Sequence, residues 1–273
     1  MSSGKKVVFI TGANTGLGLE SVKALLKSST EYEIVVGSRK IENGDNAIKE
    51  LKKEIPNAKS SLSVVQVDIE SDESIQKARD SIDSQFGRLD VLVNNAGGNF
   101  EPEVQNGKLS YREGWNKSWN VNVAGTMVLT SELVPLLLKS SDPRLLFITS
   151  GTAPLSEHDK ADTPPTKAIN GSPAAGWPKV KLMNPITMYR SSKTGMNMAV
   201  REWHRILKND GVKVWAVSPG FLATGISGIG AEQLKKIGAQ DPAVGGEFIR
   251  DVIQGERDAD VGKAIRKDSI QPW

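Results

Sequence analysis

A tyrosine and a lysine four residues apart, Tyr189 and Lys193, are the residues whose types and spacing most directly suggest chemistry. They lie in a stretch of helical period that we predict to run from Pro185 to Leu207, with Asn184 as its cap, so both side chains share one helix face. An ammonium beside a phenol favours the phenolate and should lower the pKa of Tyr189. Such a tyrosine can donate or accept a proton, which the reduction of a carbonyl requires. Because this spacing is common on amphipathic helices, further residues must support a site.

Two polar residues in apolar surroundings add to this pair. Ser150 follows the apolar run Leu145–Ile148, which we predict to be a strand, and Asn122 interrupts a largely apolar helix that begins at about Trp115. A serine after a strand often belongs to a turn, and an asparagine within a helix is often a paired core group. Taken together with the tyrosine and the lysine, the two residues indicate a catalytic site.

A glycine-rich turn follows the first predicted strand, Val7–Ile10, and precedes a predicted helix, Leu17–Lys27. Glycines let a backbone approach a pyrophosphate, and the amino end of a helix offers it unpaired N–H groups. The spacing differs from the standard dinucleotide fingerprint, and a tight turn that needs three glycines is the alternative. We predict a phosphate-binding turn made of Gly12, Asn14, Thr15, Gly16, Leu17 and Gly18.

The residues at the end of the second predicted strand indicate which cofactor binds. An acidic residue there would bind a ribose 2′-hydroxyl, whereas Ser38, Arg39 and Lys40 offer a hydroxyl and two cations. Arg39 can make a planar, charge-assisted contact with a phosphate. The alternative is that both cations are solvated surface residues. The sequence therefore favours NADPH over NADH.

Small and polar residues also follow the third and fourth predicted strands. Asp68 ends the third strand, before Ile69, and Asn94-Asn95-Ala96-Gly97-Gly98 ends the fourth. Asp68 is as well explained by a turn or a helix cap. The small residues of the second segment suit a close approach of the backbone to a nicotinamide ribose, and a simple turn is the alternative.

Elements that could position these residues alternate along the chain as short β-branched runs and longer stretches of helical period. This pattern predicts an α/β protein with one doubly wound, mainly parallel sheet of about seven strands and helices on both faces, a Rossmann fold. Ligands of such sheets bind beyond the carboxyl ends of the strands, where the candidate residues lie. We predict one domain over residues 1–273.

Composition excludes several other functions. The 35 basic and 32 acidic residues are scattered, so no nucleic-acid surface is expected. The chain has no cysteine, and His158 and His204 lack metal-ligand spacing, so we expect no metal site. The first apolar run is too short for a signal peptide or a membrane span. We therefore expect a cytoplasmic protein without membrane contact.

The motifs together resemble the short-chain dehydrogenase/reductase family, in their order and in their positions at the strand ends. The match runs from Lys6 to Thr224 and consists of Thr11-Gly12-x-x-x-Gly16-x-Gly18, Asn94-Asn95-Ala96-Gly97, Asn122, Ser150, Tyr189-x-x-x-Lys193 and Pro219-Gly220. The resemblance implies that Tyr189 is the general acid and that Ser150 orients the carbonyl. It implies that Lys193 binds ribose and lowers the pKa of Tyr189, and that Asn122 holds a water in a proton relay.

The same resemblance implies further cofactor contacts. It places Asp68 and Ile69 near the adenine and Asn95, Ala96 and Gly97 near the nicotinamide ribose. The turn that contains Pro219, Gly220, Leu222 and Thr224 would hold the carboxamide.

A long segment, residues 151–185, separates Ser150 from Tyr189 and resembles an insertion of the monomeric carbonyl reductases, as does the tail Gly262–Trp273. In those proteins the insertion covers the helix face used for assembly, so we predict a monomer. We expect the insertion, Gly98–Phe100 and a mobile lid around residues 221–240 to enclose the substrate. Phe100, Trp177 and Phe221 would favour an apolar or aromatic carbonyl compound.

Three functions remain open at this point. The first is an NADPH-dependent reductase of ketones, aldehydes or quinones. The second is a protein that binds NADPH without catalysis, as a regulator or a scaffold, and the third is an NADP-dependent alcohol dehydrogenase that works oxidatively. The presence of Asn122, Ser150, Tyr189 and Lys193 in one chain favours an enzyme over the second.

Overall fold

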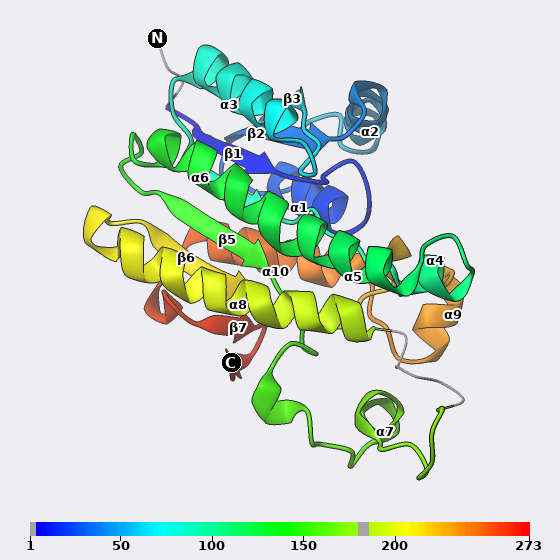
Figure 1. Ribbon diagram of the computed structural model, residues 1–273. Coiled ribbons are helices and arrows are strands. Elements are labelled where there is room, and N and C mark those ends of the chain that lie inside the picture. Colours follow the sequence, from blue (N-terminus) through cyan, green and yellow to red (C-terminus); the bar gives the residue numbers. More distant parts are fainter. Residues whose placement is uncertain (1–3, 180–185) are drawn as a thin grey trace.

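The computed structural model describes residues 4–179 and 186–273, and its centre is one eight-stranded sheet (Figure 1). The strands are β1 (Lys6–Ile10), β2 (Tyr32–Ser38), β3 (Ser61–Gln66), β4 (Val91–Asn94), β5 (Arg144–Ile148), β6 (Lys213–Val217), β7 (Ala264–Arg266) and β8 (Ser269–Gln271). Their order is β3-β2-β1-β4-β5-β6-β7-β8, and only the β7–β8 pair is antiparallel among the described strands. The chain leaves β1 toward β2 and returns on the other side at β4, so the strand order reverses between them. Such a reversal opens a crevice at the carboxyl ends of the strands.

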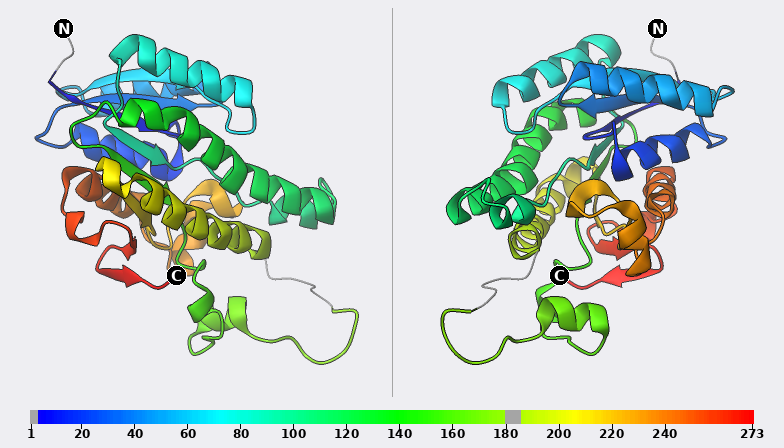
Figure 2. Two further views of the ribbon diagram at one scale, coloured as in Figure 1. Left: turned by 60° about the vertical axis from the view of Figure 1, so that its left-hand side comes forward. Right: turned by 90° about the vertical axis from the view of Figure 1, so that its right-hand side faces the viewer.

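Helices cover both faces of the sheet (Figures 1 and 2). The longer ones are α1 (Gly16–Leu26), α2 (Ile41–Glu54), α3 (Asp72–Phe86), α5 (Tyr111–Trp119), α6 (Thr126–Leu137), α8 (Thr187–Leu207) and α10 (Pro242–Gln254). A π-helical turn, η1 (Asn120–Gly125), joins α5 to α6, and the short helices are α4 (Glu101–Gln105), α7 (Pro164–Asn170) and α9 (Ala231–Lys236).

The alternation of side chains along each strand divides the core into two layers. In β1, Phe9 packs with α3, α6 and α8, whereas Val8 and Ile10 pack with α1, α2 and α10. All three side chains are buried, because helices lie on both sides of the strand. The predicted fold class, a doubly wound Rossmann sheet, is confirmed.

The structure differs from the prediction at two places. The helix expected from about Trp115 begins at Tyr111, where Ser110 and Glu113 form a capping box. The sheet has one strand more than the expected number, because the tail folds into the short β7–β8 hairpin. The predicted helix start at Pro185 and the Asn184 cap lie outside the described residues, and the described part of α8 begins at Thr187.

The described part of the long segment contains α7, which lies apart from the sheet (Figure 1). Arg190 of α8 holds it through a hydrogen bond of 2.9 Å from Nη1 to Asn170 Oδ1. Elsewhere on α8, the side chains of Met198 and Ile206 are exposed, with relative accessibilities of 60% and 50%. The described part of the insertion thus leaves these two apolar side chains uncovered.

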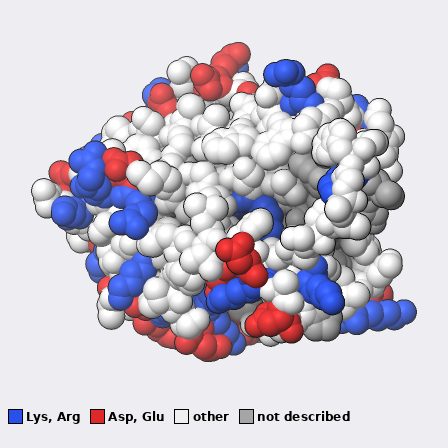
Figure 3. Space-filling model, turned by 60° about the horizontal axis from the view of Figure 1, so that its bottom comes forward, with Lys and Arg blue, Asp and Glu red and all other residues white. Residues whose placement is uncertain are grey.

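Among the described residues, no helix combines the length and apolar character needed to cross a bilayer. On the face shown in Figure 3, basic and acidic side chains lie around a broad area that carries neither. Charges of both signs are therefore mixed on this face.

An ion network ties three strands together at their amino ends, the sheet edge opposite the crevice. The Arg144 side chain is only 4% exposed, and its guanidinium bonds Asp258 at 2.6 Å and Asp142 at 3.0 Å. Lys213 contacts both carboxylates, and Lys6 contacts Asp142. Burial acts to raise the pKa of Asp142, but the hydrogen bonds from Lys213 and Lys6 outweigh it and hold this pKa well below its usual range. The hydrogen bond from Arg144 lowers the pKa of Asp258.

Replacing Arg144 with methionine should lower the free energy of unfolding by about 3 kcal/mol at pH 7, because two carboxylates lose a buried partner. Since the pKa values of Asp142 and Asp258 are lowered in the folded state, their stabilisation is complete above about pH 4 and is lost as the pH falls further. The difference between wild type and variant should therefore narrow at pH 3. Urea unfolding at both pH values measures this difference in stability. Lys77→Met, which breaks the exposed ion pair with Glu73, is the control. Equal stabilities at pH 7 would contradict the assignment.

Candidate active site

A cleft of about 1290 Å³ lies beyond the carboxyl ends of the parallel strands. It brings together most of the residues predicted from the sequence, although they are far apart in the chain. Those that line it are Gly12, Asn14, Thr15, Gly16, Leu17, Ser38, Arg39, Asp68, Ile69, Asn95, Ala96, Gly97, Ser150, Tyr189, Lys193, Pro219, Gly220, Leu222 and Thr224. Gly18 and Asn122 are the predicted residues that stand behind its walls.

The glycine turn has the backbone that a phosphate site requires. Gly12 and Gly16 have φ angles of 62° and 56°, in the left-handed region that favours glycine. Thr15, the N-cap of α1, makes no side-chain capping bond, so the first N–H groups of this helix receive no acceptor from it. Thr15, Gly16 and Leu17 line the cleft, so an anion bound there could accept from these groups. A Cβ on Gly18 would come within 2.6 Å of Gly12 O and Asn95 Nδ2. Gly18 therefore allows α1 to pack closely under the turn.

Thr11 and Asn95 join this turn to the end of β4. The Asn95 side chain donates to Thr11 O at 2.8 Å, and the Thr11 hydroxyl accepts from the Ala96 N–H at 2.9 Å. The Asn95 amide group thus holds the turn in place. Thr11 was part of the sequence motif, but only the structure reveals it as the link between two walls of the cleft.

The turn after β2 presents Arg39 to the cleft. The buried Ser38 hydroxyl donates to Lys40 O at 2.9 Å, and Gln66 donates to Arg39 O at 3.1 Å. The Arg39 and Lys40 side chains are exposed. Within the described part of the chain, the Arg39 guanidinium makes no hydrogen bond or ion pair, so it can bind an anionic group without losing another partner.

Asp68 and Gly97 line the cleft after β3 and β4. The Asp68 carboxylate accepts from the Glu70 N–H at 3.1 Å, so the residue forms a turn as well as part of the wall. A Cβ on Gly97 would lie 2.8 Å from Asn122 Oδ1 and 3.4 Å from Lys193 Nζ. A glycine at this position therefore lets the backbone approach the lysine.

The two ends of the segment expected to form a lid, residues 221–240, are hydrogen-bonded to each other. Gln240 N donates to Phe221 O at 2.8 Å, and Ala223 N donates to Gln240 O at 2.9 Å. Helix α9 lies between Ala223 and Gln240 in the sequence. Gly220, with a φ of 101°, makes the turn that precedes them.

Ser150 and Tyr189 meet in the cleft from β5 and α8. Ser150 follows β5 directly after Thr149, and Tyr189 lies in the first turn of α8. Both side chains line the cleft, and the Ser150 hydroxyl acts to lower the pKa of Tyr189. The Ser150 oxygen also accepts from the Thr152 N–H at 3.1 Å and lies 2.9 Å from the Thr152 hydroxyl. The hydroxyl groups of a serine and a tyrosine thus lie in the same cleft.

Lys193 and Asn122 lie close to Ser150 and Tyr189 and make hydrogen bonds to neighbouring segments. Lys193 Nζ donates to Ile148 O at 2.7 Å and lies 5.8 Å from the centroid of the Tyr189 ring. The buried Asn122 side chain bonds both the N–H and the C=O of Gly98 at 2.9 Å, and it donates to Ser192 at 2.9 Å. Its amide therefore fixes the Gly98 segment, and its role toward a water stays a prediction.

The acidities in the site differ from the sequence-based expectation. Loss of hydration raises the pKa of Tyr189 to about 12, although the hydrogen bond to Ser150 opposes this, and the charge of Glu101 raises it further. Burial lowers the pKa of Lys193 to about 8. The predicted fall in the pKa of Tyr189 is therefore wrong in direction for this structure. A tyrosine with this pKa keeps its proton at neutral pH, which suits a general acid.

Sequence reasoning missed three residues next to the catalytic pair and misplaced one. Gln271 is buried and donates to Ser150 O at 3.1 Å, Thr152 bonds Ser150, and Glu101 contacts the start of α8. The partners of Gln271 and Glu101 are distant in the chain, so no local motif marks these two residues, whereas Thr152 is only two residues from Ser150. Trp177, expected in the substrate pocket, is 75% exposed and does not line the cleft.

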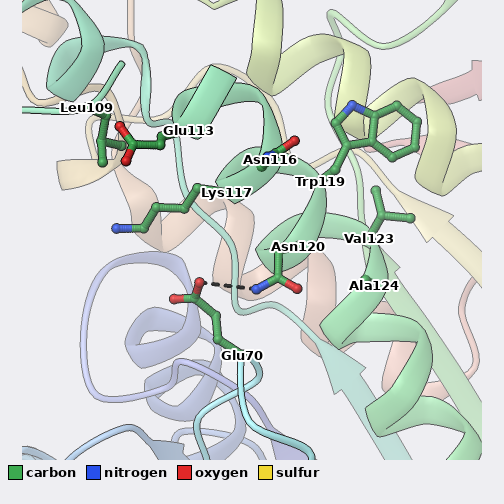
Figure 4. A pocket seen from close by; sticks show the side chains of 9 residues that line it. All are labelled: Glu70, Leu109, Glu113, Asn116, Lys117, Trp119, Asn120, Val123 and Ala124. Atoms are coloured by element: carbon green, nitrogen blue, oxygen red, sulfur yellow. Dashed lines mark hydrogen bonds between the residues drawn. The ribbon is translucent and has the colours of Figure 1, made fainter. Parts of the chain in front are cut away.

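A second hollow, of about 820 Å³, lies on the surface of α5 and η1 (Figure 4). It is lined by Glu70, Leu109, Glu113, Asn116, Lys117, Trp119, Asn120, Val123 and Ala124. The Asn120 side chain donates to Glu70 across it at 3.3 Å. None of the predicted catalytic residues lies in this hollow, so the first cleft is the candidate active site.

Comparison with known proteins agrees with this geometry. The family model for short chain dehydrogenases matches residues 6–158. The short-chain dehydrogenase/reductase eupG of Phoma sp is 45% identical over 282 residues, which cover 100% of this chain and 99% of the relative. The short-chain dehydrogenase/reductase tropE of Talaromyces stipitatus is 41% identical over 272 residues, which cover 99% of each chain.

Solved structures share the fold at low sequence identity. The NADPH-bound carbonyl reductase from chicken fatty liver superposes with a TM-score of 0.75 at 20% identity, over 98% of this chain and 99% of that one. The 3-ketoacyl-(acyl-carrier-protein) reductase from Brucella melitensis, complexed with NADH, gives 0.71 at 21% identity, over 96% of each. Neighbours with either cofactor therefore have this architecture.

Proposed function

Because this chain belongs to the short-chain dehydrogenase/reductase family, we propose that it is an NADPH-dependent reductase of a ketone, aldehyde or quinone, with Tyr189 as its general acid. The meeting of Ser150, Tyr189 and Lys193 in one cleft, with Lys193 Nζ 5.8 Å from the centroid of the Tyr189 ring, is the observation that carries the proposal. The pair faces a cleft whose other walls hold the glycine turn and Arg39.

Each side chain has a role that its environment supports. When bound, a nicotinamide cofactor supplies the hydride for such a reduction. The Ser150 hydroxyl donates a hydrogen bond to the carbonyl oxygen of the substrate and orients it. Tyr189 transfers its proton to that oxygen as negative charge develops there, and the cationic Lys193 next to it stabilises the tyrosinate that remains.

Three features of the cleft support NADPH as the cofactor. The left-handed glycines and the uncapped start of α1 suit a pyrophosphate. Arg39 and Lys40 lie at the carboxyl end of β2, where a 2′-phosphate would need cations. The predicted acidic residue Asp68 follows β3 rather than β2, and its carboxylate accepts a hydrogen bond from the Glu70 N–H.

The substrate side of the cleft supports an apolar or aromatic carbonyl compound. Phe100, Ile186, Phe221 and Ile226 line it, and Phe221 is 51% exposed. Exposed aromatic and aliphatic side chains beside a few convergent polar groups are typical of small-molecule sites.

Oxidation of NADPH and NADH, followed by absorbance with aromatic ketones, quinones and aliphatic aldehydes, tests the proposal. We expect turnover with at least one carbonyl class and a preference for NADPH. Cofactor binding without turnover across the whole panel would favour the non-catalytic alternative. Faster oxidation of the matching alcohols by NADP⁺ at neutral pH would favour the dehydrogenase alternative.

We also propose that the protein is cytoplasmic, as expected from its sequence. We further propose that it is a monomer, since residues 151–185 form a long insertion before α8. The alternative is an oligomer, in which the exposed Met198 and Ile206 side chains of α8 would contact another copy of the chain. Size-exclusion chromatography with light scattering distinguishes the two. A mass near 29.5 kDa supports the monomer, and a stable dimer or tetramer would contradict it.

A further inference from the structure

Glu101 is a buried acidic residue that the reaction outlined above does not use. Its relative accessibility is 2%, and it begins α4, directly after Phe100 of the cleft wall. One carboxylate oxygen, Oε1, accepts from the Met188 N–H and, at 3.1 Å, from the Tyr189 N–H. The other oxygen, Oε2, is buried without a hydrogen-bond partner in the described part of the chain.

These contacts give the described start of α8 an acceptor that the side chain of its N-cap residue does not provide. Ile186, its N-cap residue, has no side chain that could accept a hydrogen bond, so the first N–H groups of the helix need an acceptor from elsewhere. The Glu101 carboxylate supplies it, and its charge opposes the positive end of the helix dipole. Tyr189 lies in this first turn, so the carboxylate holds the backbone of the residue that carries the acidic hydroxyl.

The cost of burying this carboxylate argues for a specific purpose. Burial raises the pKa of Glu101, and the hydrogen bonds from Tyr189, from its own N–H and from Met188 only partly oppose it. An uncompensated buried charge costs several kcal/mol, which a neutral residue of similar size would avoid. A carboxylate at this position is therefore better explained by the helix it holds than by packing.

We propose that Glu101 is a positioning residue for Tyr189: it anchors the first turn of the catalytic helix to the segment that follows Phe100 and thereby sets where the tyrosine hydroxyl lies. Because Phe100 lines the cleft, the same contact links the substrate wall to the acid. The inference rests on the proposed reductase function for its effect on turnover, but not for the contact itself.

Glu101→Ala and Glu101→Gln test the proposal, with Glu103→Gln as a matched control. Glu103 lies on the same short helix and pairs with Lys117 near the surface at 3.6 Å. The alanine variant should lose about 10–100-fold in kcat, because a misplacement of about 1 Å can reduce catalysis to this extent, while KM for NADPH changes less than about twofold. Glutamine retains an acceptor oxygen of the same reach, so it should restore kcat to within about fivefold of wild type. The control should match wild type.

Hydrogen–deuterium exchange of the peptide that covers Met188 and Tyr189 supplies a readout that does not depend on turnover. Faster exchange in Glu101→Ala, with near wild-type exchange in Glu101→Gln, supports the proposal. Unchanged kcat and exchange in the alanine variant would overturn it, as would a parallel loss of kcat, NADPH affinity and thermal stability. If the alanine variant does not fold, the glutamine variant decides. Lost turnover together with fast exchange in Glu101→Gln would overturn the proposal, whereas turnover and exchange close to those of wild type support it. If wild type reduces no carbonyl, the proposed function fails, and exchange alone decides the role of Glu101.

Discussion

Replacing Tyr189 with phenylalanine is expected to lower kcat for carbonyl reduction about 1000-fold, within the range by which a positioned proton donor accelerates such reactions. The phenol lines the cleft together with Ser150 and is protonated at neutral pH, because burial raises its pKa to about 12. Phenylalanine keeps the ring and its packing and removes the hydroxyl group that carries the proton. NADPH affinity, measured by fluorescence titration, should change less than about threefold, because the glycine turn and Arg39 are untouched.

Tyr111→Phe is a suitable control for this experiment. Tyr111 is 47% exposed at the start of α5, so removal of its hydroxyl should leave turnover unchanged. Wild-type turnover in Tyr189→Phe would exclude the tyrosine as the acid. A loss of NADPH binding as large as the loss of turnover would indicate that the ring, rather than its proton, is what the site needs.

The second large effect is expected at Arg39, whose exchange for aspartate should reverse the cofactor preference. The substitution removes a charge-assisted contact worth about 1.5–3 kcal/mol and sets a carboxylate at the end of β2. We therefore expect kcat/KM for NADPH to fall about 100-fold and kcat/KM for NADH to rise, since a carboxylate there can accept from a ribose 2′-hydroxyl. Steady-state kinetics with both cofactors at a saturating carbonyl concentration measure the change.

Lys40→Asp is the matched control, because Lys40 is the neighbouring exposed cation. Its side chain can approach a phosphate only as a flexible point charge, so the NADPH preference should weaken about tenfold or less. Equal kcat/KM values for the two cofactors in wild type would contradict the assignment of Arg39. A larger effect at Lys40 than at Arg39 would transfer the role to the lysine.

Much of the cleft could be predicted because its residues follow strands. A parallel α/β sheet places the carboxyl ends of all its strands at one edge, so any residue directly after a strand is a candidate for the site. The glycine turn after β1, Arg39 after β2 and Ser150 after β5 are recognisable for this reason. Tyr189 and Lys193 could be paired because one turn of helix separates them.

The prediction of acidity failed for a different reason. The effect of a lysine on a tyrosine was predicted from their spacing, but the pKa of Tyr189 depends mainly on how much water reaches it. Hydration is a property of the assembled cleft, to which distant segments contribute. The same holds for the low pKa of Lys193, which is set by burial between β5 and α8.

The sequence by itself therefore determined the mainly parallel sheet, the helices on both of its faces and the chemical groups at its carboxyl edge, because these depend on periodicity and on short motifs. Only the tertiary structure decided that Asn95 holds the phosphate turn, that Gln271 bonds the backbone of Ser150, and that Glu101 holds the start of α8. Each of these side chains acts on a partner that is remote in the chain. Their alignment depends on how the helices and the tail pack around the sheet, and no local pattern of residues encodes it.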